Sequence, residues 1–89
     1  MSYRVRLTPA ASRALANELP TKVAEAAIAL IFGDLKQNPR RVGKPLEAPF
    51  APAYVARRGS YRLIYLINDE EVEILVTKIA HRAWIYRSN

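Results

Sequence analysis

The chain has 89 residues, a formal net charge of +6 and no cysteine. This length predicts a single domain, 1–89, and the lack of cysteine excludes disulfides and cysteine-ligated zinc sites. No apolar run approaches the roughly 20 residues of a membrane span, so we expect a cytoplasmic protein that does not contact a membrane.

Basic residues are concentrated in one stretch of the sequence. Residues 36–62 contain seven Lys and Arg residues and one acidic residue, Glu47. The acidic residues gather further on, at Asp69, Glu70, Glu71 and Glu73. A solvated basic surface is the simplest explanation of a positive charge, but this uneven distribution favours a polyanionic or acidic partner, with nucleic acid as one candidate.

The first half of the chain predicts a strand followed by two helices. Apolar and charged residues alternate over residues 3–7, which is typical of a half-buried strand. Thr8 is a suitable N-cap, with Pro9 at the first position of a helix that runs to about residue 19. Pro20-Thr21 breaks this helix and caps a second one over about residues 22–37.

The second helix is apolar nearly all round, because Ile28 and Phe32 extend its hydrophobic face. We therefore expect it to be the most buried element of the domain. Asn38-Pro39 ends it, and a loop over residues 40–53 should be anchored to the core by Leu46 and Phe50.

The second half predicts three antiparallel strands at residues 54–58, 61–67 and 72–79. Gly59-Ser60 predicts a type II′ turn, which places Arg57 opposite Arg62 on one face. Like charges in that position destabilise a sheet, so we expect a negative ligand there. A second turn at residues 68–71, with Ile67 opposite Val72, would place Thr77 opposite Arg62. The helices should cover the apolar face, formed by Tyr61, Leu63, Tyr65, Ile67, Val72, Ile74 and Val76.

These elements predict an α+β fold in the order β-α-α-β-β-β. It consists of a small antiparallel β-sheet, which includes the N-terminal strand, and a helical hairpin packed on one face.

Three motifs resemble those of the RelE/ParE toxin superfamily, RelE-like branch. They are Gly-Lys-Pro-Leu at residues 43–46, Gly-Ser-Tyr-Arg-Leu-Ile-Tyr at 59–65 and His-Arg-Ala-Trp-Ile-Tyr-Arg at 81–87. The resemblance implies a type II toxin that forms a hetero-oligomer with a cognate RelB-like antitoxin. The RelE branch cleaves mRNA in the ribosomal A site and inhibits translation, whereas the ParE branch attacks DNA gyrase.

The residues that match the family pattern favour the RelE branch. Arg62, Arg82 and Tyr86 match its catalytic positions, and Arg57 matches one of two basic positions on the strand before the turn. The other basic position falls on Val55, where this chain departs from the pattern. The resemblance implies an endoribonuclease. The sequence has no metal-ligand cluster, and we expect neither a metal nor a cofactor.

Cleavage of this kind needs a deprotonated 2′-hydroxyl, a stabilised phosphorane and a protonated 5′-oxygen. Arg57, Arg62 and Arg82 are suited to charge stabilisation, since guanidinium groups match phosphate oxygens. Tyr86 is a candidate for proton transfer or for stacking on a base. His81 is a second candidate for proton transfer, and the alternative is a structural histidine that ends the last strand.

Four further basic residues are predicted to bind RNA: Arg40, Arg41, Lys44 and Arg58. Arg40 and Arg41 would attract phosphates in general, and Lys44 or Arg58 could compensate for Val55. Three alternatives remain open at this point. The arginines could contact an acidic antitoxin, the chain could inhibit gyrase by protein binding, or it could be a toxin fold that has decayed to a DNA-binding co-repressor.

Overall fold

The computed structural model describes residues 2–80 and the backbone of His81. Its elements are β1 (Arg4–Leu7), α1 (Pro9–Arg13), the π-helical turn η1 (Ala14–Glu18), α2 (Thr21–Leu30), the π-helical turn η2 (Ile31–Leu35), α3 (Pro39–Val42), β2 (Lys44–Pro45), β3 (Tyr54–Arg58), β4 (Tyr61–Asn68) and β5 (Glu73–His81). No helix within this described part is long and apolar enough to cross a membrane.

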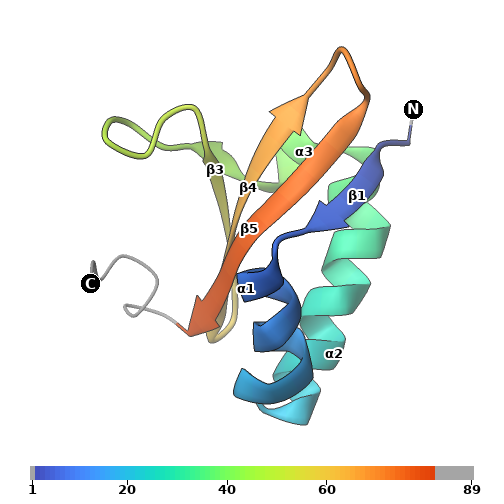
Figure 1. Cartoon of the computed structure of the whole chain (residues 1–89), viewed down its shortest axis with the longest axis vertical. Helices are drawn as coiled ribbons and strands as arrows, with labels where there is room; N and C mark the ends of the chain where they lie inside the picture. The colour runs from blue at the N-terminus through green and yellow to red at the C-terminus, as the bar shows by residue number, and fades with distance from the viewer. Residues whose placement is uncertain (1, 82–89) are drawn as a thin grey trace.

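The five strands form one sheet in the order β1-β5-β4-β3-β2. Helices α1 and α2 lie together on one side of it (Figure 1). The α+β class and the one-sided helical hairpin are thus confirmed. The expectation of a wholly antiparallel sheet is wrong for one pair, because β1 runs parallel to β5. The other three pairs are antiparallel.

The hairpin between β3 and β4 follows the sequence prediction. Arg57 lies opposite Arg62 in the register of the two strands. Gly59 has a φ of 55°, and Ser60 is not among the residues with positive φ. A type II′ turn requires this combination, since only its first central residue has a positive φ.

The predicted pairing between β4 and β5 is wrong. Ile67 pairs with Ile74, two positions beyond the predicted Val72, and Arg62 pairs with Ala80 rather than Thr77. Two structural causes account for the difference. The four-residue turn lies one position later than predicted, at residues 69–72 between the paired Asn68 and Glu73, and an irregularity next to Ile64 leaves Thr77 without a partner opposite it. An extra residue in one strand reverses which face the following residues occupy.

Thr8 joins the first helix to this irregular part of β5. Its hydroxyl oxygen accepts the Ala11 amide at 3.2 Å, which confirms the predicted N-cap. The same hydroxyl donates to the Thr77 carbonyl at 2.8 Å. The second predicted cap is wrong, because Thr21 is the first residue of α2 and Pro20 occupies the cap position without a side-chain hydrogen bond.

The core lies between the helices and one face of the sheet. Small residues on the helices (Ala11, Ala14 and Ala27) are buried there against larger residues of the sheet. The sheet contributes Tyr61, Leu63, Tyr65, Ile74 and Val76, as the sequence predicted, together with Ile79. Strict alternation after Ile74 and Val76 would place Ile79 on the opposite face, and the extra residue at Thr77 brings it into the core.

Helix α2 and its extension η2 are less buried than predicted. Ile28 and Phe32 are 43% and 51% exposed, and the buried positions are Ala24, Ala27, Ile31 and Leu35. The reason is that a single layer of helices on a sheet can bury only one stripe of each helix. An apolar composition all round the helix therefore did not predict burial.

The predicted loop over residues 40–53 contains two short elements. Helix α3 forms one turn, and β2 pairs Lys44 with Val55 and Pro45 with Tyr54 at the edge of the sheet. Leu46 packs against Val55 and Ile64, on the side of the sheet away from the helices. Phe50 is 42% exposed, so the expectation that it anchors the loop to the core is wrong.

Candidate nucleic-acid interface

On the face of the sheet opposite the helices, the four strands β2, β3, β4 and β5 each carry one cationic side chain. Arg57 and Arg62 pair directly across β3 and β4. Lys44 on β2 pairs with Val55, two residues before Arg57, and Lys78 on β5 pairs with Ile64, two residues after Arg62. Paired residues share a face and every second residue along a strand returns to it. All four cations therefore belong to one surface, which we call the basic face.

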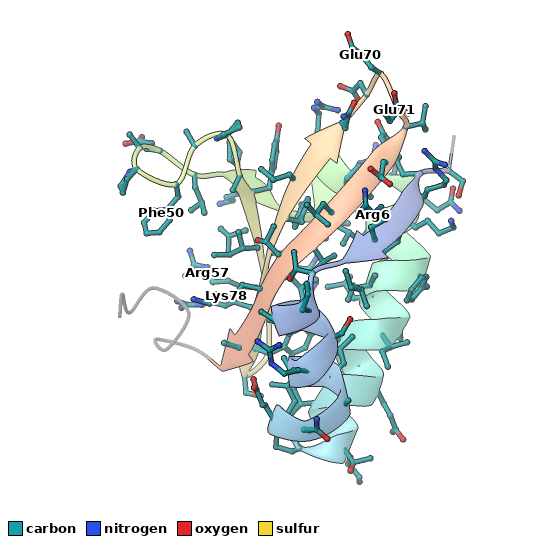
Figure 2. All side chains as sticks on the ribbon, in the orientation of Figure 1. Arg6, Phe50, Arg57, Glu70, Glu71 and Lys78 are labelled. Carbon is teal, nitrogen blue, oxygen red and sulfur yellow. The ribbon has the colours of Figure 1, made fainter. Side chains whose placement is uncertain are left out.

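Figure 2 shows Arg57 and Lys78 extending to the same side of the sheet, away from the helices. A small apolar patch separates the cations. It is formed by Ala53, Val55 and Ile64, which are buried, and by Leu46, Leu66 and Ala80, which are partly buried. Apolar area between cations suits a nucleotide, because the base and ribose can rest on the patch while the phosphates meet the charges.

A hollow of about 460 Å³ opens at the edge of this face, where β2 begins. Its lining comes from residues 42–46, which run from the end of α3 through β2, and from Val55, Arg57 and Arg58 of β3. It holds three cations, with Lys44 and Arg57 on the basic face and Arg58 next to them. Among the described residues that line it, none is acidic. This hollow has the charge and depth to accept a phosphate group.

Gly43 fixes the position of Lys44 through close contacts. A Cβ atom at residue 43 would collide with the Tyr65 hydroxyl and lie 2.6 Å from the Val55 carbonyl oxygen. The buried Tyr65 hydroxyl donates to the Pro39 carbonyl at 2.6 Å. Burial is the main cause that raises the pKa of Tyr65, to about 12. Through these contacts on the helix-covered side of the sheet, Tyr65 fixes the segment that carries Lys44.

The Arg58 side chain lies on the opposite face of β3 from that of Arg57. It pairs with Tyr61, which belongs to the helix-covered core. Its guanidinium donates to the Arg57 carbonyl at 2.7 Å and to the Val42 carbonyl at 3.4 Å. Arg58 therefore reaches the hollow from the helix side, around the edge of β3.

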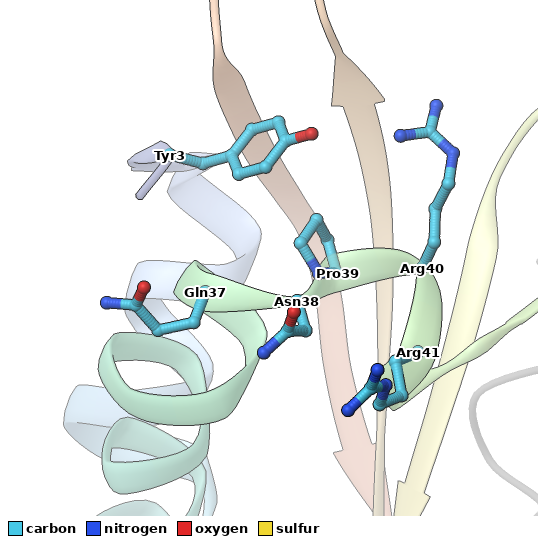
Figure 3. Close-up of a pocket in the computed structure, with 6 residues that line it drawn as sticks. All are labelled: Tyr3, Gln37, Asn38, Pro39, Arg40 and Arg41. Carbon is cyan, nitrogen blue, oxygen red and sulfur yellow. The ribbon is translucent and has the colours of Figure 1, made fainter. Parts of the chain in front are cut away.

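Arg40 forms an ion pair away from the basic face. Its guanidinium makes two hydrogen bonds to Asp69, at 3.1 and 2.7 Å, and the Tyr3 hydroxyl donates to the same carboxylate at 2.8 Å. The hydrogen bond from Arg40, followed by that from Tyr3, lowers the pKa of Asp69. Figure 3 shows the Tyr3 hydroxyl pointing toward the Arg40 guanidinium at a cavity of about 330 Å³, which Arg41 also lines. The RNA-binding roles of Arg40 and Arg41 stay predictions.

The acidic residues of the β4–β5 turn lie away from the basic face (Figure 2). Glu70 and Glu71 lie in the β4–β5 turn, at the opposite end of the two strands from Arg57 and Lys78 (Figure 2). Glu73 is paired with Arg6 at 3.7 Å. The described part of the chain contains no cluster of three or more His, Cys, Asp or Glu side chains that could hold a metal ion. The four cations of the basic face suit an anionic ligand.

Three of the predicted catalytic residues are not placed by the structure. Arg82 and Tyr86 lie outside the described residues. His81 is described only by its backbone, which pairs with Tyr61 at the end of β5. Arg57 and Arg62 are thus the two predicted catalytic residues that the structure brings together.

Comparison with known proteins identifies the family. The model of the ParE toxin of type II toxin–antitoxin systems matches residues 5–86. The chain belongs to the RelE/ParE family of type II toxins. It is 46% identical to toxin RelG of Mycobacterium tuberculosis over 98% of this chain and 99% of RelG. It is 41% identical to toxin RelE of the same organism, over 98% of this chain and 89% of that toxin.

Solved structures agree with this assignment. The toxin–antitoxin complex RelBE2 of M. tuberculosis matches with a TM-score of 0.87 and 43% identity, over 92% of this toxin and all of that chain. The isolated Escherichia coli RelE toxin matches with a TM-score of 0.74 at 22% identity, over 96% of this toxin and 92% of that chain, and shows the shared fold.

The structure of this toxin adds Lys78 to the residues that the sequence suggested for the site. Alternation along residues 72–79 placed Thr77 rather than Lys78 on the basic face. The signal that could have revealed Lys78 is the spacing of the buried residues Ile74, Val76 and Ile79. A spacing of two followed by a spacing of three indicates one extra residue in the strand.

Proposed function

We propose that this toxin is a ribosome-dependent endoribonuclease that cleaves mRNA in the A site and so inhibits translation. The observation that carries the proposal is the direct pairing of Arg57 with Arg62 on the face without helices. Opposed cations destabilise a sheet pair. A polyanion that passes over this face compensates for that cost when it binds.

In the proposed reaction, the 2′-oxygen of a ribose attacks the adjacent phosphorus and the bond from phosphorus to the 5′-oxygen breaks. The products are a 2′,3′-cyclic phosphate and a 5′-hydroxyl. Arg57 and Arg62, with Arg82, stabilise the extra negative charge of the phosphorane, since guanidinium groups stay charged and bind phosphate oxygens in pairs. Proton transfer is assigned to His81 and Tyr86.

We also propose that a RelB-like antitoxin neutralises this toxin in a cytoplasmic hetero-oligomer. The support is the 43% identity to a chain of the RelBE2 toxin–antitoxin complex. The ribosome would hold the mRNA in the correct orientation for cleavage. This domain has few acid–base candidates, so alignment of the substrate would contribute a large part of its rate enhancement.

The test is expression of the toxin without antitoxin, followed by mapping of mRNA 5′ ends on and off ribosomes. We expect new 5′ ends on ribosome-bound mRNA. We also expect Arg62→Ala to reduce cleavage by about 100-fold or more, as loss of a transition-state donor does. Arg13→Ala, a change at an exposed residue of α1, is the matched control and should cleave like the parent.

Two results would contradict the proposal. One is full toxicity of both Arg62→Ala and Arg82→Ala. The other is growth arrest with DNA-damage signalling and no mRNA cuts, which would support gyrase inhibition. If expression is harmless to cells, the co-repressor alternative gains support.

A further inference from the structure

The irregularity in β5 is a β-bulge that is held by specific hydrogen bonds. Tyr65 pairs with Val76 and Ile64 pairs with Lys78, so Thr77 is an extra residue between two regular pairs. The Thr77 hydroxyl donates to the Ile64 carbonyl at 3.1 Å, and the Thr77 carbonyl accepts the Thr8 hydroxyl at 2.8 Å. The Thr8 amide also donates to the Val76 carbonyl at 3.0 Å.

This bulge decides which face Lys78 occupies. If the pairing of Tyr65 with Val76 continued without an extra residue, Ile64 would pair with Thr77 and Leu63 with Lys78. Leu63 is fully buried beneath the helices, so Lys78 would then point into the apolar core. The bulge instead pairs Leu63 with Ile79, which is 4% exposed, and turns Lys78 to the basic face.

Lys78 completes a row across the sheet. The cross-strand order is Lys44, Val55, Ile64 and Lys78, so a lysine lies at each end of the two apolar residues. The neighbouring row contains Arg57 and Arg62. Arg62 is diagonal to Lys78, a relation that places backbone positions about 7–8 Å apart, within reach of long side chains. Val55 stands where the family pattern has a basic residue. In this row it lies between Lys44 and Lys78.

We propose that Lys78 is an RNA-contacting residue of this site, and that it binds a backbone phosphate beside the one held by Arg57 and Arg62. This inference rests on the proposed ribonuclease function for the identity of the ligand, single-stranded RNA. The apolar patch takes the ribose and base between two phosphates. An ammonium suits this role because it binds phosphate as a point charge without needing paired geometry.

The test measures binding without cleavage. The probe is a short single-stranded RNA with 2′-O-methyl groups, which removes the attacking hydroxyl. Its dissociation constant is measured for the full chain over a series of salt concentrations. Each lost phosphate contact on a single strand lowers the slope of log affinity against log salt by about 0.7. We expect this decrease for Lys78→Gln and a slope close to the parent for Lys78→Arg.

The matched control is Lys22→Gln, which makes the same charge change at an exposed residue of α2. It should leave the slope unchanged. An unchanged slope for Lys78→Gln, an equal decrease for both variants, or no measurable binding by the parent would each overturn the inference. A Lys78-dependent slope in a protein that cuts no ribosome-bound mRNA would instead contradict only the proposed cleavage, so the two failures are distinguishable.

Discussion

The two faces of β4 have opposite characters. On the helix-covered face, Tyr61, Leu63 and Tyr65 are at most 5% exposed. On the basic face, Arg62 and Leu66 are partly exposed, and Arg62 lies opposite Arg57. Burial on the first face stabilises the sheet, and this allows the second face to keep opposed charges. The comparison indicates that stability and ligand binding are assigned to different sides of the same strand.

The largest expected effect comes from truncating adjacent residues on the two faces. We expect Leu63→Ala to lower the free energy of unfolding by about 2–5 kcal/mol, because the site is closed on all sides. Ile64→Ala should cost roughly 1 kcal/mol less, since its patch borders solvent and can collapse around the change. Denaturant titration of both variants measures the difference. Equal losses would contradict the division between the two faces.

The parts of the fold that local chemistry controls could be predicted from the sequence. Gly59 indicated the hairpin because glycine tolerates the positive φ that the turn requires. Thr8-Pro9 indicated the first helix because Thr is a common N-cap and Pro a common first helical residue. The failures concern information that is not local. The parallel pairing of β1 joins residues 4–7 to residues 73–76, which are far apart in the sequence. The exposure of Phe32 in η2 depends on tertiary packing, because the described part of the chain places no second layer over the outer side of α2 and η2.

The same difference between local and non-local information explains why only part of the candidate site could be predicted. The opposition of Arg57 and Arg62 follows from a two-residue turn, which fixes the register of its strands. The position of Lys78 depends on a bulge that is held by Thr8, a residue far away in the sequence. The short elements α3 and β2, which position Lys44, span four and two residues and are too brief to show a periodic pattern.

A medium effect is expected where the core supports the basic face. Tyr65→Phe removes the hydrogen bond to the Pro39 carbonyl and should cost about 1–2 kcal/mol. The pKa of Tyr65 is about 12 in the folded chain, against an unfolded value near 10. Because the folded pKa is raised, the stabilisation by Tyr65 is fully present below pH 10 and is lost as the pH rises through 12.

The difference in unfolding free energy between parent and Tyr65→Phe should therefore be constant up to about pH 10 and decrease above it. Urea titrations over this pH range measure it. Other titrating groups are common to both proteins and cancel in the difference. A difference that grows between pH 10 and 12 would contradict a buried, protonated Tyr65.

The smallest expected effect tests the basic face itself and has the opposite sign. Arg57→Gln removes one of two opposed charges, so it should raise the free energy of unfolding by a few tenths of a kcal/mol. The same change should weaken RNA binding. The gain should disappear at about 1 M salt, where the Debye length is only about 3 Å. Arg13→Gln on α1 is the control of equal charge and should show neither effect. A loss of stability in Arg57→Gln at low salt, or a gain that persists at high salt, would show that the opposed arginines are not in electrostatic conflict, and the argument that this face is kept for a polyanion would lose its basis.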